Sequence, residues 1–143
     1  MPVHKEKRVV PYTAAQMFDL IAAVNKYPEF LPWCVASRIT RREGDVFYAD
    51  LVIGYKMLRE KFTSRVTALR PDHIHVEYMD GPMKQLSNHW RFLDNGDGSC
   101  TIDFYVEFDF KNPVLRKLVE MFFNEAIKRM VQAFDNRAKI LYS

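Results

Sequence analysis

The sequence predicts a single α+β domain in which a curved antiparallel sheet of about six to seven strands packs on one long C-terminal helix. The middle of the chain, from residue 45 to residue 110, repeatedly alternates apolar and polar residues with the period of two expected for half-buried strands. Residues 113–142 instead carry apolar side chains at the helical spacing of three and four. A chain of 143 residues without a repeat, linker or low-complexity tract fits one domain spanning residues 1–143.

The N-terminal part predicts a strand followed by a short helix. The stretch "HKEKRVV" forms the strand, which Pro11 ends. Thr13 then supplies an N-cap and Gln16 the third helical residue of a capping box. Apolar residues follow at helical spacing: Met17, Leu20, Ile21 and Val24.

The central strands are predicted from their alternation and from the turns between them. They are expected within residues 45–54, 58–69, 73–80, 88–93 and 100–110, with "NGDGS" at 95–99 as a hairpin turn. We interpret "DGPMKQ" at 80–85 as a connecting loop that exposes Met83 and Lys84. The result is a meander of about six strands after the first helix.

The last helix has a clear beginning, with Asn112 as N-cap and Pro113 at the first helical position. At about 1.5 Å per residue, residues 113–142 would run roughly 45 Å, the length of a whole sheet. Its apolar stripe is wide, which predicts that the sheet covers or curls around it.

Composition narrows the class of protein. The formal net charge is +3 and aromatic residues make up 14% of the chain. No apolar run approaches the ~20 residues of a membrane span, and the first residues lack the apolar core of a signal peptide, so we expect a cytoplasmic protein. Cys34 and Cys100 belong to no CxxC pair and are expected to be reduced and buried. No P-loop, GxSxG or dinucleotide motif is present.

The stretch "NKYPEFLPWCVASRI", residues 25–39, concentrates bulky apolar residues where Pro28 and Pro32 forbid a continuous helix. Two interpretations stay open. These side chains either plug one end of the core or form the roof of a cavity. The residues concerned are Tyr27, Phe30, Leu31 and Trp33.

Two charged residues occupy apolar positions. Glu60 shares a strand face with Leu58 and Phe62, so it either faces a ligand or is turned to solvent by a bulge or strand end. Arg137 lies within the apolar arc of the last helix. It either reaches a polar group at a cavity mouth or interacts with the C-terminal helix dipole while its stem covers apolar surface.

The remaining polar candidates favour no enzyme. His73 and His75 share a strand face without a third ligand at suitable spacing, and His89 is expected to face solvent, so no metal site or catalytic base is predicted. Basic residues gather on one strand pair and along the last helix, where phosphates of lipid or RNA would be attracted. They are Lys56, Arg59, Lys61, Arg65 and Arg70, then Arg116, Lys117, Lys128, Arg129 and Lys139. No aromatic platform for stacking bases is recognised among them.

Three stretches carry a family resemblance. "VPYTAAQMFDLIAAVNKYPEFLPWC", "LREKFTSRV" and "GPMKQLSNHWRF" resemble the coenzyme Q-binding, polyketide-cyclase-like family of START-like helix-grip proteins, over nearly the whole chain. The "YPEFLPWC" portion is the most specific. The resemblance implies an apolar tunnel between sheet and helix that binds ubiquinone or a related polyprenyl lipid in support of respiration, without a catalytic cofactor. Some bacterial members of the family are named instead as toxins that bind the large ribosomal subunit.

Three functions therefore stay open. The first is non-enzymatic lipid binding, with transient contact at the inner membrane. The second is ribosome binding through the basic surface, and the third a cyclase that uses Glu60. DNA is not an expected partner. The residues expected to contact a lipid ligand are Tyr27, Phe30, Leu31, Trp33, Glu60, Phe62, Tyr78, Trp90, Phe104, Phe122, Phe123 and Ile127.

Overall fold

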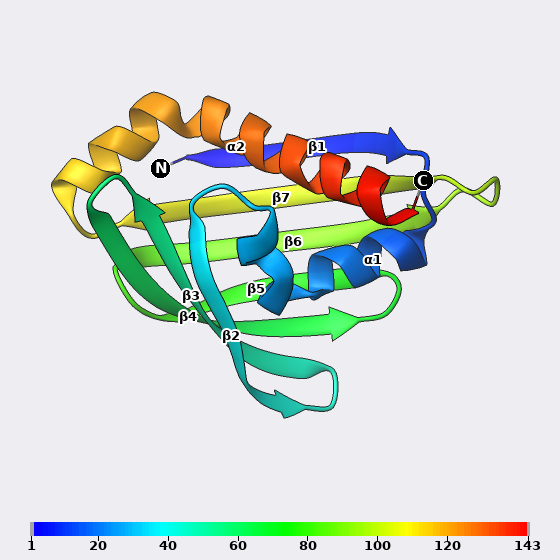
Figure 1. Cartoon of the computed structure of the whole chain (residues 1–143), viewed down its shortest axis with the longest axis horizontal. Helices are drawn as coiled ribbons and strands as arrows, with labels where there is room; N and C mark the ends of the chain where they lie inside the picture. The colour runs from blue at the N-terminus through cyan, green and yellow to red at the C-terminus, as the bar shows by residue number, and fades with distance from the viewer. Residues whose placement is uncertain (1, 143) are drawn as a thin grey trace.

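The computed structural model describes residues 2–142 and contains a seven-stranded antiparallel sheet with the order β1-β7-β6-β5-β4-β3-β2. The elements in chain order are β1 Val3–Val10, α1 Ala14–Ala22, the 3₁₀ helix η1 Val24–Glu29, β2 Cys34–Glu43, β3 Val46–Tyr55, β4 Leu58–Leu69, β5 His73–Asp80, β6 Met83–Asp94, β7 Cys100–Phe110 and α2 Pro113–Tyr142. Figure 1 shows α2 running along β7 while the strands β2 and β3 cross the direction of β6, so that the sheet curves. The predicted α+β arrangement, a curved antiparallel sheet gripping a long C-terminal helix, is confirmed.

The capping residues predicted from the sequence form the N-terminal ends of α1 and α2 as expected. The backbone N–H of Gln16 donates to Thr13 Oγ1 at 3.1 Å, and that of Thr13 donates to Gln16 Oε1 at 2.9 Å, which completes the capping box. At the start of α2, the N–H of Val114 donates to Asn112 Oδ1 at 2.8 Å. These caps satisfy backbone donors that the first helical turn leaves free.

One strand was not located from the sequence. The edge strand β2 has register shifts on β3 between Cys34 and Ala36 and between Ile39 and Arg41. Each shift changes the face that the following side chains occupy, so the period of two is lost.

The start of β6 also corrects a prediction. This strand begins at Met83, which pairs with Phe110 and is buried, so the interpretation of Met83 as an exposed loop residue is wrong. A register shift between Met83 and Gln85 interrupts the alternation and hides the strand start. Lys84 is exposed, as expected.

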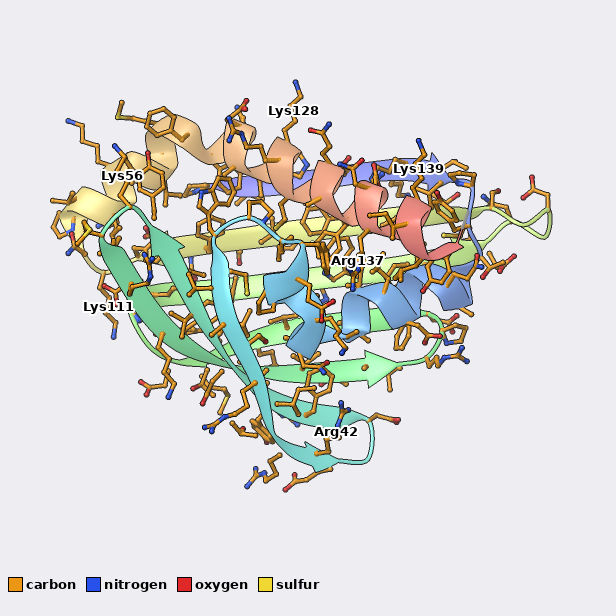
Figure 2. All side chains as sticks on the ribbon, in the orientation of Figure 1. Arg42, Lys56, Lys111, Lys128, Arg137 and Lys139 are labelled. Atoms are coloured by element: carbon orange, nitrogen blue, oxygen red, sulfur yellow. The ribbon has the colours of Figure 1, made fainter. Side chains whose placement is uncertain are left out.

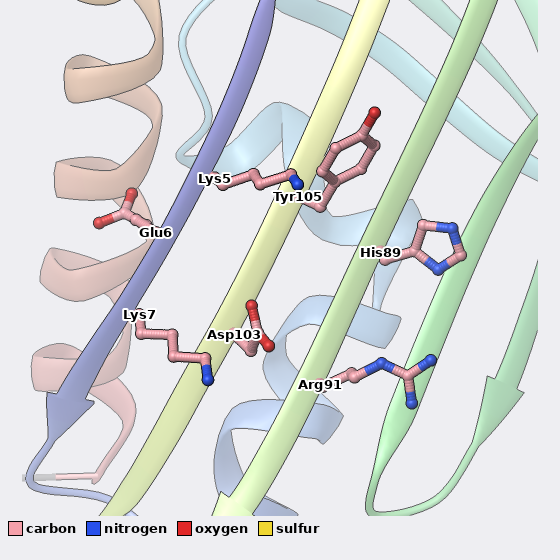
Figure 3. A pocket seen from close by; sticks show the side chains of 7 residues that line it. All are labelled: Lys5, Glu6, Lys7, His89, Arg91, Asp103 and Tyr105. Carbon is pink, nitrogen blue, oxygen red and sulfur yellow. The ribbon is translucent and has the colours of Figure 1, made fainter.

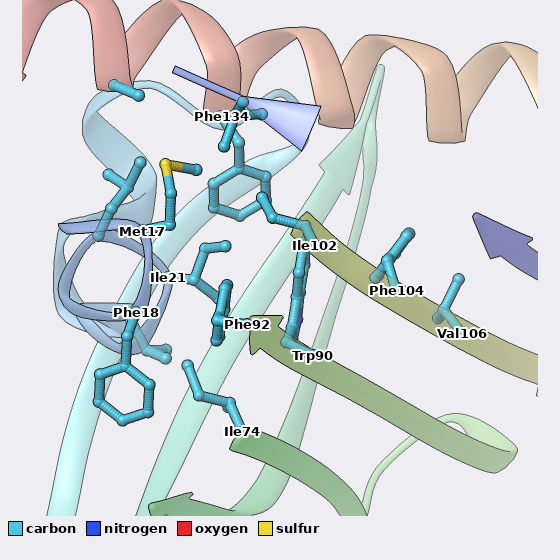
Figure 4. Close-up of a cluster of buried hydrophobic side chains, with 14 of the residues drawn as sticks. Met17, Phe18, Ile21, Ile74, Trp90, Phe92, Ile102, Phe104, Val106 and Phe134 are labelled. Carbon is cyan, nitrogen blue, oxygen red and sulfur yellow. The ribbon is translucent and has the colours of Figure 1, made fainter. Parts of the chain in front are cut away.

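The larger of the two core clusters lies between α1, the sheet and the C-terminal half of α2 (Figure 4). Trp90 stacks on Phe104 with ring centroids 4.2 Å apart, and the ring of Phe134 on α2 meets Trp90 edge-on at 5.5 Å. Aromatic pairs in these geometries add to the free energy gained from burial alone. A second, smaller cluster packs under the first turn of α2 and contains Phe62, Met83, Phe110 and Leu115.

Both cysteines are free and buried, as predicted. Within residues 2–142, no helix combines the length and apolar character that a membrane crossing requires.

Candidate ligand-binding cavity

A cavity of about 650 Å³ lies between the concave face of the sheet and α2. Its walls come from β3 through β7, from the η1–β2 segment and from the face of α2 between Leu115 and Phe134. Almost all of the wall is apolar. This size and lining are typical of sites for small hydrophobic molecules.

Nine of the predicted ligand-contact residues line this cavity: Tyr27, Leu31, Trp33, Glu60, Phe62, Trp90, Phe122, Phe123 and Ile127. The other three are not part of its wall. Phe104 is fully buried against Trp90, Phe30 packs edge-on against Phe134, and Tyr78 accepts a hydrogen bond from the Met83 N–H. Ligand contact by any of these residues stays a prediction.

The aromatic segment 27–33 both roofs the cavity and plugs the core. Tyr27, Leu31 and Trp33 border the cavity, whereas Phe30 fills space between Tyr27 and α2. The Tyr27 hydroxyl donates to the carbonyl of Ile21, and burial, with a smaller contribution from Cys34, raises the pKa of this phenol above its ordinary value. Tyr27 is therefore a neutral, anchored part of the roof.

Glu60 projects from β4 into the cavity wall and is partly exposed. Among residues 2–142, no side chain or backbone group forms a hydrogen bond or an ion pair with its carboxylate. The interpretation in which Glu60 faces the ligand space therefore fits the geometry better than the one in which a bulge turns it away.

Four polar residues of the wall were missed as ligand contacts by the sequence reasoning: Ser64, Asn88, and the ion-paired Glu125 and Arg129. Ser64 lies on the same face of β4 as Phe62 and Val66, and Asn88 lies on the same face of β6 as Trp90. The alternation of each strand already placed them inward, which is the signal that could have identified them. Asn88 is held at both ends, because its Oδ1 accepts from Trp90 Nε1 and its Nδ2 donates to the Tyr105 carbonyl, each at 2.9 Å.

Arg137 reaches a charged group of the segment that roofs the cavity and also covers apolar surface, so it shows features of both predicted alternatives. Its guanidinium contacts Glu29 of η1 and lies over the ring of Phe30, and Arg137 is not part of the cavity wall. Figure 2 labels Arg137 among the side chains of the chain. It connects the last turns of α2 to the roof segment.

Five of the ten predicted basic residues are neutralised by neighbouring carboxylates. Lys61 contacts Asp50, Arg65 contacts Glu77 and Arg70 contacts Asp19. On α2, Arg116 and Arg129 likewise pair with Asp109 and Glu125.

Lys56 and Arg59 differ from their neighbours at the β3–β4 turn. Arg59 donates to the backbone carbonyls of Lys56 and Leu58, and Lys56 lies over the ring of Tyr55. Neither has an acidic partner among residues 2–142. They provide the uncompensated positive charge of this turn, beside the cavity wall residues Tyr55 and Leu58.

The structure adds His89 to the pair His73 and His75, which the sequence already placed on one strand face. His75 is directly opposite His89 in the β5–β6 register, with ring centroids 3.9 Å apart, and His73 Nε2 lies 3.3 Å from His89 Nδ1. Burial, with smaller contributions from neighbouring positive groups, lowers the pKa of both His73 and His89. Because the rings are stacked, their nitrogen lone pairs do not converge on one point, and no metal-binding group of His, Cys, Asp or Glu occurs within the described chain.

A second, polar groove of about 570 Å³ lies on the outer face of the sheet (Figure 3). Lys5, Lys7 and Arg91 contribute positive charge, Glu6 and Asp103 contribute negative charge, and Tyr105 and His89 complete the lining. The rings of His89 and Tyr105 are interleaved with these cations, which sequence order did not reveal.

Together, the curved sheet, the helix across it and the enclosed apolar space define a helix-grip fold with a ligand-sized cavity. Residues 10–135 match the family model described as polyketide cyclase / dehydrase and lipid transport, and the chain belongs to this family. The predicted family resemblance is thus confirmed.

Individual relatives have different names. The ribosome association toxin RatA of Pseudomonas aeruginosa is 34% identical over 134 residues, covering 94% of this chain and 93% of that protein. The mitochondrial coenzyme Q-binding protein COQ10 homolog B of Xenopus laevis is 32% identical over 97% of this chain, which spans 59% of the length of that relative. A START superfamily protein from Mycobacterium smegmatis shares the fold with a TM-score of 0.80, covering 97% of this chain and 98% of that one, at 16% identity.

Proposed function

We propose that this protein binds ubiquinone or a related polyprenyl lipid in the cavity between sheet and α2, without catalysing a reaction, and so supports respiratory electron transport. The observation that carries the proposal is the apolar cavity itself. Each Å² of apolar ligand surface that leaves water contributes roughly 25 cal/mol, so binding is favourable with few polar contacts. The coenzyme Q-binding name of the Xenopus relative supports this choice of ligand.

The chemistry of the wall favours binding over catalysis. Burial raises the pKa of the Cys34 thiol to about 11, and the phenol of Tyr27 is also held neutral by burial. Glu60 is a carboxylate without a hydrogen-bonded nucleophile or base among the described residues. The hydrogen-bonded charged pair that the wall does contain, Arg129 with Glu125, is exposed, and an arginine stays protonated and so does not act as a general base. A cyclase that used this cavity would need its substrate to supply the partner that Glu60 lacks.

The rim suggests that the ligand enters from a membrane surface. Met57, at the β3–β4 turn, is 96% exposed, and Phe122 of α2 is 52% exposed at the cavity wall. Lys56 and Arg59 add positive charge to the same turn, which favours contact with anionic lipid head groups. A cytoplasmic protein with this rim would contact the inner membrane transiently to load or unload a lipid.

The first experiment is solvent extraction and mass spectrometry of the protein purified from a quinone-producing host. Ala126 lines the wall, so Ala126→Trp should fill the space and reduce the co-purified quinone. Asn124→Trp, at an exposed position of the same helix outside the wall, is the matched control. A wild-type protein that carries no isoprenoid quinone, and binds none on reconstitution, would refute the proposal.

A second candidate is binding to the large ribosomal subunit, favoured by the RatA relative that matches this chain over nearly its whole length. The uncompensated Lys56 and Arg59 are the cations we assign to such a contact. The double change Lys56→Glu with Arg59→Glu should abolish co-sedimentation with ribosomes, because phosphate contacts dominate RNA affinity. Lys139→Glu, near the opposite end of α2 in Figure 2, is the control, and unchanged sedimentation of the double variant would exclude this surface.

A further inference from the structure

Ser64 is a polar residue whose environment leaves it without a partner. It is 0% exposed, and its Oγ forms no hydrogen bond with any atom of the described residues. A hydroxyl removed from water without a hydrogen bond is unfavourable, and most buried hydroxyls avoid this state. A molecule bound in the cavity is therefore the remaining partner for the Ser64 hydroxyl.

The residues next to Ser64 explain why no protein group forms a hydrogen bond with its hydroxyl. On β3 its partner is Ala49, whose side chain has no polar atom. On β5 its partner is Tyr78, whose hydroxyl accepts from the Met83 N–H at 3.1 Å and forms no hydrogen bond with Ser64 Oγ. Along its own strand face, the adjacent wall residues are Phe62 and Val66.

The other deep polar side chain of the wall, Asn88, is in the opposite situation. Its oxygen and nitrogen are both engaged by the protein, through Trp90 and the backbone of Tyr105. Ser64 therefore supplies the unsatisfied hydrogen-bonding group of the deep wall, whereas Glu60 lies four residues along β4, about 13 Å nearer the β3–β4 turn.

We propose that the Ser64 hydroxyl donates a hydrogen bond to an oxygen of the bound molecule, so that the ligand is held with its polar head inward and its apolar tail toward the β3–β4 turn. This inference rests on the proposed lipid-binding function and specifies its ligand class, an apolar molecule that carries a carbonyl or similar acceptor oxygen. Head-first binding also explains how a cavity of about 650 Å³ accepts a molecule with a long tail. The tail passes Phe62 and leaves through the exposed apolar rim.

The test compares two ligands with the same tail: a short-chain prenylated benzoquinone, and the corresponding prenylated benzene without oxygens. Trp33 and Trp90 are the two tryptophans of the chain and both line the cavity, so quinone binding is measured by quenching of their fluorescence. The benzene analogue is measured by competition. Ser64→Ala should weaken quinone binding about two- to ten-fold, the value of one hydrogen bond, and leave the affinity for the benzene analogue unchanged.

Ser37→Ala is the matched control, because Ser37 Oγ is also buried without a partner but lies outside the cavity wall. It should change neither affinity. In the absence of ligand, Ser64→Ala should melt at the same temperature as the wild type or higher, since it removes an unsatisfied hydroxyl.

Each other outcome has a separate meaning. If Ser64→Ala changes both affinities equally, or neither, the head-group assignment is wrong while lipid binding stands. A lower melting temperature of the empty Ser64→Ala variant would also overturn it, by showing a structural hydrogen bond. If the wild type binds neither ligand, the proposed function itself fails.

Discussion

Arg137 near the end of α2 and Glu29 at the end of η1 form a contact of 2.7 Å between Nη2 and Oε1, although 108 residues separate them. The same guanidinium lies 5.1 Å from the centre of the Phe30 ring. One side chain thus holds the roof segment to the helix through both charge and ring contact. The roof segment is therefore held closed by a surface ion pair and by packing. This combination allows the segment to open and close.

Glu29→Gln should release ligand faster without unfolding the protein. The Glu29 side chain is half exposed, so loss of this pair should lower the free energy of unfolding by less than about 1 kcal/mol. The roof would open more often, and the dissociation rate of a prenylated quinone should rise in stopped-flow tryptophan fluorescence.

Lys26→Met is the control for this effect. Lys26 Nζ is 3.8 Å from the other carboxylate oxygen of Glu29, and both side chains are exposed. It should leave the dissociation rate unchanged, and an equal acceleration in both variants would show that the contact with Arg137 has no special role.

Trp33 should separate the effects of side chain and backbone. Its side chain lines the cavity, while its backbone adopts a positive φ of 66°, a conformation that costs an L residue about 1 kcal/mol or more. Trp33→Ala and Trp33→Gly should both weaken quinone binding, monitored through the remaining Trp90. In urea denaturation, the free energy of unfolding of Trp33→Gly should exceed that of Trp33→Ala by about 0.5 kcal/mol. The relief of backbone strain outweighs the added entropy of the unfolded chain. Wild-type affinity in both variants would show that the Trp33 side chain is not part of the roof over the ligand.

Cys34 should report whether the cavity is occupied. Burial raises the pKa of both Cys34 and Cys100 to about 11, so at pH 8 the reactive thiolate fraction of each is about a hundred-fold smaller than that of a free thiol. Cys34 lines the cavity, whereas Cys100 is sealed in the core. Bound quinone should therefore slow alkylation of Cys34 and leave that of Cys100 unchanged, as measured by peptide mass spectrometry. Equal protection of both would indicate global stabilisation instead.

The strands and helices that are specified by local sequence patterns could be predicted from the sequence. The bounds of β7 and the Asn112–Pro113 start of α2 matched the structure residue for residue, because both depend on neighbours in sequence, whereas the alternation over β7 held only as far as Glu107, and Asp109 is buried. The irregular strand β2 was missed because its register shifts are set by its partner β3. The aromatic composition of the roof was visible, but the volume beneath it depends on how far the whole sheet curves.

Contacts across strands were the part that sequence could not provide. His75 meets His89 only because β5 and β6 pair in one particular register, which no local pattern determines. Ser64 looked like an ordinary strand residue until the structure showed that Ala49 and Tyr78 flank it without satisfying its hydroxyl.

The histidine stack should make the folded protein less stable in mild acid. The pKa of His73 and of His89 is lowered in the folded state, mainly by burial, from the ordinary value of 6.5. Below pH 6.5 the unfolded chain therefore binds protons at these positions that the folded chain does not, and stability falls as the pH drops from there toward the folded-state pKa values. Urea denaturation at a series of pH values between 7 and 5 should show this loss, and the combined change His73→Gln with His89→Gln should flatten it. A pH dependence that the double variant leaves intact would assign the loss to other groups, and an increase in stability on acidification would contradict the predicted sign.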